Sequence, residues 1–174
     1  LAEFRNSDPA KAGRVMGLCS LTSTIMAAVA TTSLLLFASP IAETVLKAPH
    51  LSTGLRIGAL FLFFSTINGY QAGALAGLEA FAKLARAGIL SGITAIAAIA
   101  IGSFTGHLNG AMAGLGISAI FRCLYHYWYL RVHTKALGIK VDYGRGFVDE
   151  RSIILKFALP AAVGGYFSMP IIWF

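Results

Sequence analysis

Long runs without a charged side chain constrain this chain most. A transmembrane helix needs about 20 mostly apolar residues to cross a hydrocarbon core of about 30 Å. Only 12% of the residues are charged, against roughly 25% in an average soluble domain, which argues against an ordinary water-soluble globule. We expect an integral membrane protein whose helices follow the runs without Asp, Glu, Lys or Arg, which are 15–42, 57–78, 87–121 and 157–174.

The third run is too long for one crossing, because a straight helix of 35 residues would measure about 52 Å. Turn-forming residues at 103–110 predict a break in its middle. We therefore expect an all-α polytopic helix bundle, since backbone polar groups in lipid must be satisfied within helices, and nothing shows the alternation of a membrane barrel. The five predicted spans are 12–39, 56–78, 85–104, 109–130 and a last one within 152–174, which stops while still apolar.

The ends of the first span carry recognisable signals. Asp8-Pro9 predicts a helix start, with Asp as the N-cap and Pro at the first helical position. Pro40 predicts a loss of regularity because it lacks a backbone donor. Residues 41–53 then form an external connection with room for one amphipathic turn.

Lys and Arg predict the orientation in the membrane. Twelve of the fourteen fall in one set of connections or close to it, and only Lys47 and Arg56 fall in the opposite set. Under the positive-inside rule, residues 1–14, 79–86 and 131–156 are cytoplasmic, in the plasma (inner) membrane. Residues 131–151 form a basic loop between 1–130 and the start of the next span at 152. An aromatic belt at the cytoplasmic interface is predicted for Tyr125, Tyr127, Trp128 and Tyr129.

A basic stretch with aromatic residues can also bind RNA by stacking. The neighbouring apolar run of 35 residues disfavours this, so we expect the lipid bilayer, and no nucleic acid, as a partner.

Glycines recur every four residues and predict close helix contacts. This spacing places small residues on one helix face, where two backbones can approach. Glycine is common in membrane helices, which accounts for isolated pairs more easily than for a stripe of three. The predicted helix-packing glycines are Gly69, Gly73 and Gly77 in the second span, and Gly110 and Gly114 in the fourth.

No enzymatic signature is present. The sequence has no nucleophile elbow, no zinc-protease motif, no phosphate-binding loop and no paired carboxylates within a span. Cys19 and Cys123 suit small apolar fillers, and His107 shares an external turn with Asn109 but no third metal ligand. We expect no catalytic residues, no metal and no cofactor.

Three polar residues lie inside predicted spans. Asn68 and Gln71 are three apart near mid-membrane, where buried amides either hydrogen-bond a neighbouring helix or line a wet cavity. Arg122 either snorkels to the cytoplasmic headgroups or attracts anions at a cavity mouth. These three residues are the candidates for a substrate cavity.

Four stretches together resemble the bacterial polysaccharide transporters, the O-antigen and repeat-unit flippases of the multidrug/oligosaccharidyl-lipid/polysaccharide exporter superfamily. NGYQAGALAGLEAFAKLA (68–85) resembles the family's fourth helix and following loop, and LNGAMAGLGIS (108–118) the start of its sixth. LKFALPAAVGGYFSMPIIW (155–173) resembles the start of its seventh helix, and AEFRNSDPAKAGRVMGL (2–18) the link before its third.

The resemblance implies a piece of a longer protein: part of the first of two lobes among twelve to fourteen helices. It implies alternating access and an undecaprenyl-pyrophosphate-linked oligosaccharide as cargo, carried across the bacterial inner membrane for O-antigen, capsule or exopolysaccharide synthesis. A polysaccharide polymerase and other assembly proteins are implied partners. Rivals are a peptidoglycan lipid flippase or a cation-coupled drug exporter and, less favoured, a membrane-bound enzyme or a structural membrane subunit.

Overall fold

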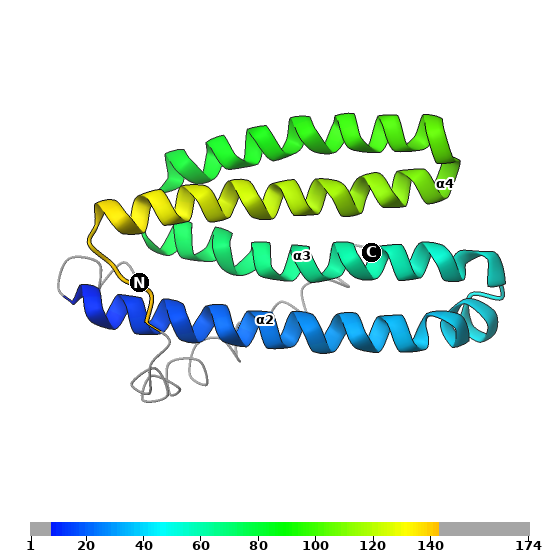
Figure 1. Ribbon diagram of the computed structural model, residues 1–174, viewed down its shortest axis with the longest axis horizontal. Coiled ribbons are helices and arrows are strands. Elements are labelled where there is room, and N and C mark those ends of the chain that lie inside the picture. The colour runs from blue at the N-terminus through cyan, green and yellow to red at the C-terminus, as the bar shows by residue number, and fades with distance from the viewer. Residues whose placement is uncertain (1–7, 143–174) are drawn as a thin grey trace, which may run out of the picture.

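The computed structural model describes residues 8–142, and over this range the chain is a bundle of long helices (Figure 1). The predicted last span within 152–174 lies outside the described residues, as do residues 1–7 and 143–151. The elements in chain order are α2 (Pro9–Pro40), the π-helical turn η1 (Ile41–Val45), the 3-10 turn η2 (Pro49–Leu51), α3 (Ser52–Gly77) and α4 (Phe81–Ala136).

The start of α2 matches the expectation from Asp8-Pro9. Asp8 has non-helical dihedral angles, and its Oδ1 accepts a hydrogen bond of 2.9 Å from the backbone N–H of Lys11. Pro9 occupies the first helical position, where its missing N–H costs nothing because that group has no intrahelical partner. The predicted helix start is confirmed.

The other end of α2 does not stop before its proline. The helix includes Pro40 and passes into η1, so the connection is helical through Val45. Lys47 then adopts a left-handed conformation (φ 50°), and η2 leads directly into α3. Arg56 of α3 donates a hydrogen bond of 3.1 Å to the hydroxyl of Ser39, which joins the two helices at this end.

α4 folds back on itself at the predicted break. Gly106 and His107 have non-helical dihedral angles, and Figure 1 shows the residues before and after them running side by side in opposite directions. We call residues 81–105 the first arm and residues 108–136 the second arm. The arms extend past the predicted spans 85–104 and 109–130, because the polar residues at their ends are also helical. The second arm ends at Ala136, and Gly138 (φ 68°) adopts the left-handed conformation that commonly follows a helix end.

The two arms meet through backbone, at glycines. A Cβ atom added to Gly102 or Gly110 would lie closer than 3.0 Å to the carbonyl oxygen of the other. A Cβ on Gly114 would collide in the same way with the carbonyl oxygen of Ala98. Small residues therefore set the spacing of this hairpin.

Three helices are long and apolar enough to cross a membrane: 9–45, which comprises α2 and η1, 49–77, which comprises η2 and α3, and 81–136, which is α4. Their large side chains face outward over much of their length: Leu36 is 71% exposed, Ile96 74% and Phe104 89%. A water-soluble protein rarely exposes apolar surface on this scale, whereas lipid tails accept it. The fold is thus all-helical and membrane-compatible.

The largest buried cluster lies at the end where α2 begins. It joins the start of α2, the end of α3, the turn between α3 and α4, the second arm and the segment after it. Toward the opposite end, the buried hydrophobic residues are alanines. The cluster consists of Ala12, Met16, Ala74, Leu75, Leu78, Ala80, Leu130 and Ile139.

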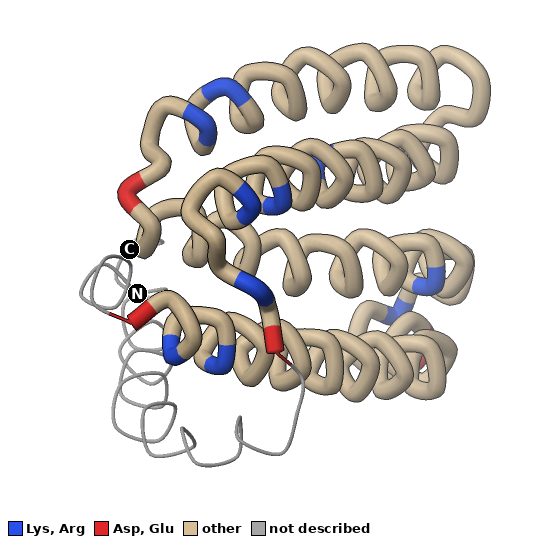
Figure 2. Tube along the Cα trace, turned by 60° about the vertical axis from the view of Figure 1, so that its left-hand side comes forward, with Lys and Arg blue, Asp and Glu red and all other residues tan. Residues whose placement is uncertain are grey.

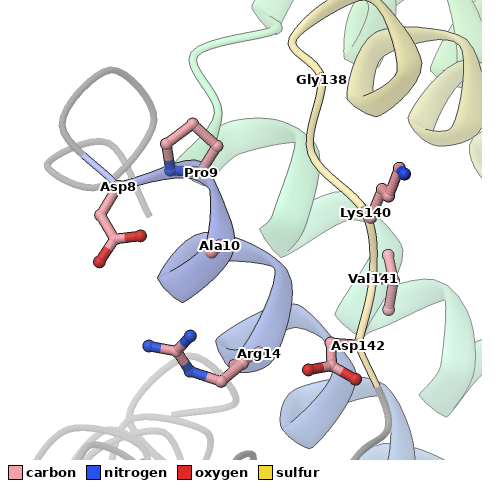
Figure 3. A pocket seen from close by; sticks show the side chains of 8 residues that line it. All are labelled: Asp8, Pro9, Ala10, Arg14, Gly138, Lys140, Val141 and Asp142. Carbon is pink, nitrogen blue, oxygen red and sulfur yellow. The ribbon is translucent and has the colours of Figure 1, made fainter.

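The segment after α4 crosses the first turns of α2 (Figure 3). The N–H of Asp142 donates to the carbonyl of Gly13 at 3.3 Å. A Cβ atom on Gly13 or Gly17 would collide with the carbonyl oxygen of Lys140 or Asp142, respectively. The glycines near the start of α2 thus make room for a returning backbone segment.

Charge is concentrated at the same end (Figure 2). Of the Lys and Arg residues that the structure describes, two lie at the opposite end: Lys47, between η1 and η2, and Arg56, near the start of α3. Asp and Glu within the described range lie outside α2, α3 and α4. The charge asymmetry expected from the sequence is therefore present in the folded bundle.

Candidate functional site

A cavity of about 500 Å³ lies between three helices at the cation-rich end. Met16 and Ser20 line it from α2, and Ile67, Tyr70 and Gln71 from α3. The second arm of α4 and the segment after it close the remaining side. We call this space the basic cavity, and its lining from that side is Tyr127, Leu130, Arg131, Thr134, Lys135, Ile139, Lys140 and Val141.

Three cations give the basic cavity its charge. Arg131, Lys135 and Lys140 line it and are exposed, and no carboxylate lines it among the residues that the structure describes. Because the positive charges have no opposite charge beside them in the lining, the space attracts anions.

Helix periodicity brings these residues together. Tyr127, Arg131 and Lys135 are four apart and share one face of the second arm. Met16 and Ser20 have the same spacing on α2, and so do Ile67 and Gln71 on α3. From the sequence, these cations predicted only the sidedness of the chain. The four-residue spacing of Tyr127, Arg131 and Lys135 was the available signal of a shared surface.

Gln71 combines the two roles expected for a buried amide, because it hydrogen-bonds a neighbouring helix and also lines a cavity. It is 4% exposed, and its Nε2 donates to Sγ of Cys123 at 3.4 Å, so it joins α3 to the second arm. It also lines the basic cavity, and its Oε1 is buried without a hydrogen-bond partner among the described residues. An unsatisfied buried acceptor costs about 1–3 kcal/mol, which a suitable donor would recover.

Asn68 lies one turn earlier on α3 and is 9% exposed. Its Nδ2 is buried with no hydrogen-bond partner within the described range, and it is not part of the lining of the basic cavity.

Arg122 is placed apart from the basic cavity. Its side chain is half-buried and does not line that space. Its backbone carbonyl accepts a hydrogen bond of 2.9 Å from Nδ1 of His126. The next residue along the helix, Cys123, accepts the hydrogen bond from Gln71. The structure records no contact between the side chain of Arg122 and either Asn68 or Gln71 within the described range.

A polar contact ties the two arms of α4 close to the basic cavity. Nζ of Lys83, on the first arm, donates to Nδ1 of His133, on the second arm, at 2.7 Å. His133 precedes the cavity residue Thr134, whose hydroxyl donates to the carbonyl of Arg131 at 3.2 Å. The Lys83 contact therefore joins this end of the second arm to the first arm, and the Thr134 hydrogen bond lies within the second arm itself.

The five predicted packing glycines fall into two groups. Gly110 and Gly114 lie at the backbone contact between the arms of α4. Gly69 and Gly73 are exposed, and a Cβ atom on either would meet nothing within 4 Å. Gly77 is the last residue of α3. The described helices thus approach through the glycines of α4, and the Gly69 and Gly73 face of α3 is open.

The part of the chain that the structure describes contains no group of three His, Cys, Asp or Glu residues placed to hold a metal ion. Cys19 and Cys123 are both free thiols, and His107 occupies the turn between the arms. The described site thus consists of cations, hydroxyls and one amide around a cavity. Comparison with protein-family models, with curated proteins and with solved structures finds no match for this chain.

Proposed function

We propose that this chain is part of a flippase that moves undecaprenyl-pyrophosphate-linked oligosaccharide across the bacterial inner membrane. The cargo passes from the cytoplasmic to the external leaflet by alternating access, and no bond is made or broken. Its role is the synthesis of O-antigen, capsule or exopolysaccharide. A polysaccharide polymerase and other assembly proteins would act next to it.

The observation that carries the proposal is the combination of long apolar helices with charge at one end. The helices are of membrane-crossing length, their outer surface is apolar, and cations gather where α2 begins (Figure 2). This arrangement supports a polytopic protein with residues 1–14, 79–86 and 131–156 in the cytoplasm. The resemblance of residues 2–18, 68–85, 108–118 and 155–173 to repeat-unit flippases supplies the cargo and the two-lobe architecture. The five proposed spans come from the runs without charged side chains.

Arg122 is the proposed contact for the pyrophosphate. It is the one Lys or Arg located within the middle of a described apolar arm, far from either end of α4. Arg pairs with phosphate oxygens through charge-assisted hydrogen bonds. Asn68 and Gln71 are proposed as further contacts for the cargo, with Gln71 in the lining of the basic cavity and Asn68 and Arg122 outside it.

A second candidate is another superfamily member, namely a peptidoglycan lipid flippase or a cation-coupled drug exporter. Coupling to a cation is favoured by a carboxylate within the membrane. In the described range Asp8, Glu79 and Asp142 lie outside the helices of membrane-crossing length, and Glu43 lies in η1, the last turn of the helix 9–45. No carboxylate lies in the middle of a described helix. This placement favours the sugar-lipid cargo over the drug exporter. A membrane-bound enzyme or a structural subunit is less favoured, because the chain presents no converging nucleophile and acid/base groups.

The test deletes the gene that encodes this chain and restores it in variant forms. Deletion should abolish surface polysaccharide and accumulate its lipid-linked repeat unit in the inner leaflet. Arg122→Lys should restore export better than Arg122→Ala, because lysine keeps the charge.

Normal surface polysaccharide after deletion would overturn the flippase proposal. Increased drug sensitivity with normal polysaccharide would favour the exporter. Full export by both variants would leave Arg122 as a snorkelling residue.

A further inference from the structure

We propose that the basic cavity binds the headgroup of an anionic phospholipid that carries free hydroxyls, of the phosphatidylglycerol type. The phosphate would lie against Arg131, Lys135 and Lys140, and the hydroxyls would face the polar side chains deeper in the cavity. This site shares Gln71 with the proposed cargo contacts but does not include Arg122, and it does not rest on the proposed function.

The position of the basic cavity matches the depth of lipid phosphates. The second arm, residues 108–136, would measure about 43 Å as a helix of that length, close to the roughly 40–45 Å of a bilayer with its headgroup layers. Its last turns, which carry Arg131 and Lys135, therefore fall in a headgroup layer. Tyr127 lines the cavity and is 52% exposed on the outer surface of the arm, so the lining reaches the lipid-facing side.

The charge of the lining selects an anion. Three cations and no carboxylate line the cavity among the described residues. None of the three cations forms an ion pair within the described part of the chain. Basic pockets between helices on the cytoplasmic side suit anionic headgroups. A second, larger hollow of about 700 Å³ at the start of α2 (Figure 3) is lined by Asp8 and Asp142 as well as by cations, so its charge is mixed and it lacks this selectivity.

The uncharged lining selects hydroxyls and an apolar stem. Gln71 brings a buried amide oxygen without a partner among the described residues, which a ligand hydroxyl can satisfy as donor. Ser20 and Thr134 add hydroxyls to the same lining. Met16 and Ile67 offer apolar contact to a glycerol or acyl segment. The volume of about 500 Å³ is within the roughly 300–1,000 Å³ of small-molecule sites.

The direct test titrates dioctanoyl-phosphatidylglycerol into the purified chain in detergent and follows binding by native mass spectrometry. Dioctanoyl-phosphatidylserine tests an anionic headgroup without hydroxyls, dioctanoyl-phosphatidylcholine a zwitterionic one, and glycerol 1-phosphate a free phosphate. We expect phosphatidylglycerol to bind about tenfold more tightly than phosphatidylcholine, because both carry the phosphate but choline brings a positive charge toward a cationic lining and offers no hydroxyl to Gln71. Glycerol 1-phosphate should bind more weakly than phosphatidylglycerol because it lacks the apolar stem.

Matched double variants separate the cavity from general surface charge. Arg131→Gln with Lys140→Gln removes two cavity cations and should weaken phosphatidylglycerol binding about tenfold. Lys47→Gln with Arg86→Gln removes two charges outside the cavity and should leave the affinity unchanged. Gln71→Met should reduce the preference for phosphatidylglycerol over phosphatidylserine, because methionine accepts no strong hydrogen bond.

Equal weakening by both double variants would overturn the proposal, since binding would then depend on net charge alone. Equal affinity for phosphatidylglycerol and phosphatidylcholine would overturn the anion selectivity. Equal affinity for glycerol 1-phosphate would overturn the lipid assignment. These readouts measure lipid binding and do not depend on export. A negative binding result would therefore leave the flippase proposal standing, and a negative export result would leave the lipid site to be tested by itself.

Discussion

Three non-glycine residues hold left-handed backbone conformations at the turns between helices: Lys47, Glu79 and His107. Side chains with a Cβ atom rarely adopt these dihedral angles, and each instance costs of order 1–3 kcal/mol. His107 combines φ 48° with ψ −130°, a region in which only glycine is comfortable. The hairpin of α4 is thus closed by a residue poorly suited to its turn.

His107→Gly should stabilise the protein by about 1 kcal/mol, because the relief of backbone strain exceeds the entropy that glycine loses on folding. The midpoint of unfolding by dodecyl sulfate in mixed micelles measures the effect. His107→Ala is the matched control, since it removes the imidazole but keeps the Cβ atom. An equal gain from both variants would show that the imidazole, and not the backbone, destabilises the turn.

At the scale of helices, packing depends on where glycines meet backbone. Gly102, Gly110 and Gly114 occupy the contact between the two arms of α4, whereas Gly69 and Gly73 lie on an open face of α3. The four-residue spacing is the same in both places, so spacing alone does not distinguish a filled contact from an open one.

Gly110→Ala should destabilise the chain by about 1–3 kcal/mol, the usual range for inserting a methyl group into a tightly packed site. Its Cβ atom would collide with the carbonyl of Gly102, a backbone atom that cannot move aside easily. Gly73→Ala should be neutral or stabilise by up to about 1 kcal/mol, since nothing lies within 4 Å. Denaturant titration of both variants tests the difference, and a larger loss at Gly73 would place a further contact on that face of α3.

At the scale of the whole molecule, charge gives the bundle a direction. The cations, the largest buried cluster and the basic cavity all occur where α2 begins and α4 ends. In the orientation that we propose from the positive-inside rule, this end faces the cytoplasm. The end that carries Lys47 and Arg56 would then face outward.

Labelling of single cysteines tests this orientation. In a background with Cys19 and Cys123 changed to alanine, Lys47→Cys in spheroplasts should react with a membrane-impermeant maleimide. Arg86→Cys should react only after the membrane is opened. The reverse pattern would invert the assigned sidedness, and reaction of both sites in closed spheroplasts would contradict a spanning bundle.

Within the described residues, local sequence patterns predicted the long apolar helices and the break in α4, whereas the helix at Pro40 continues into η1. The N-cap at Asp8 and the break near His107 follow from local chemistry, because caps and turns depend on neighbouring residues. A run of about 20 residues without charge likewise predicts a membrane-length helix, because length and composition can be read directly along the chain. The uneven distribution of Lys and Arg was likewise visible before folding.

Only the tertiary structure decided which of these residues meet. The Gln71 contact with Cys123 and the gathering of Arg131, Lys135 and Lys140 around one cavity join helices far apart in the sequence. The helix period defines the face a residue occupies, but not the neighbour that this face meets. That neighbour depends on how the backbones approach, which the glycine contacts of α4 and the crossing of residues 139–142 over α2 set in three dimensions.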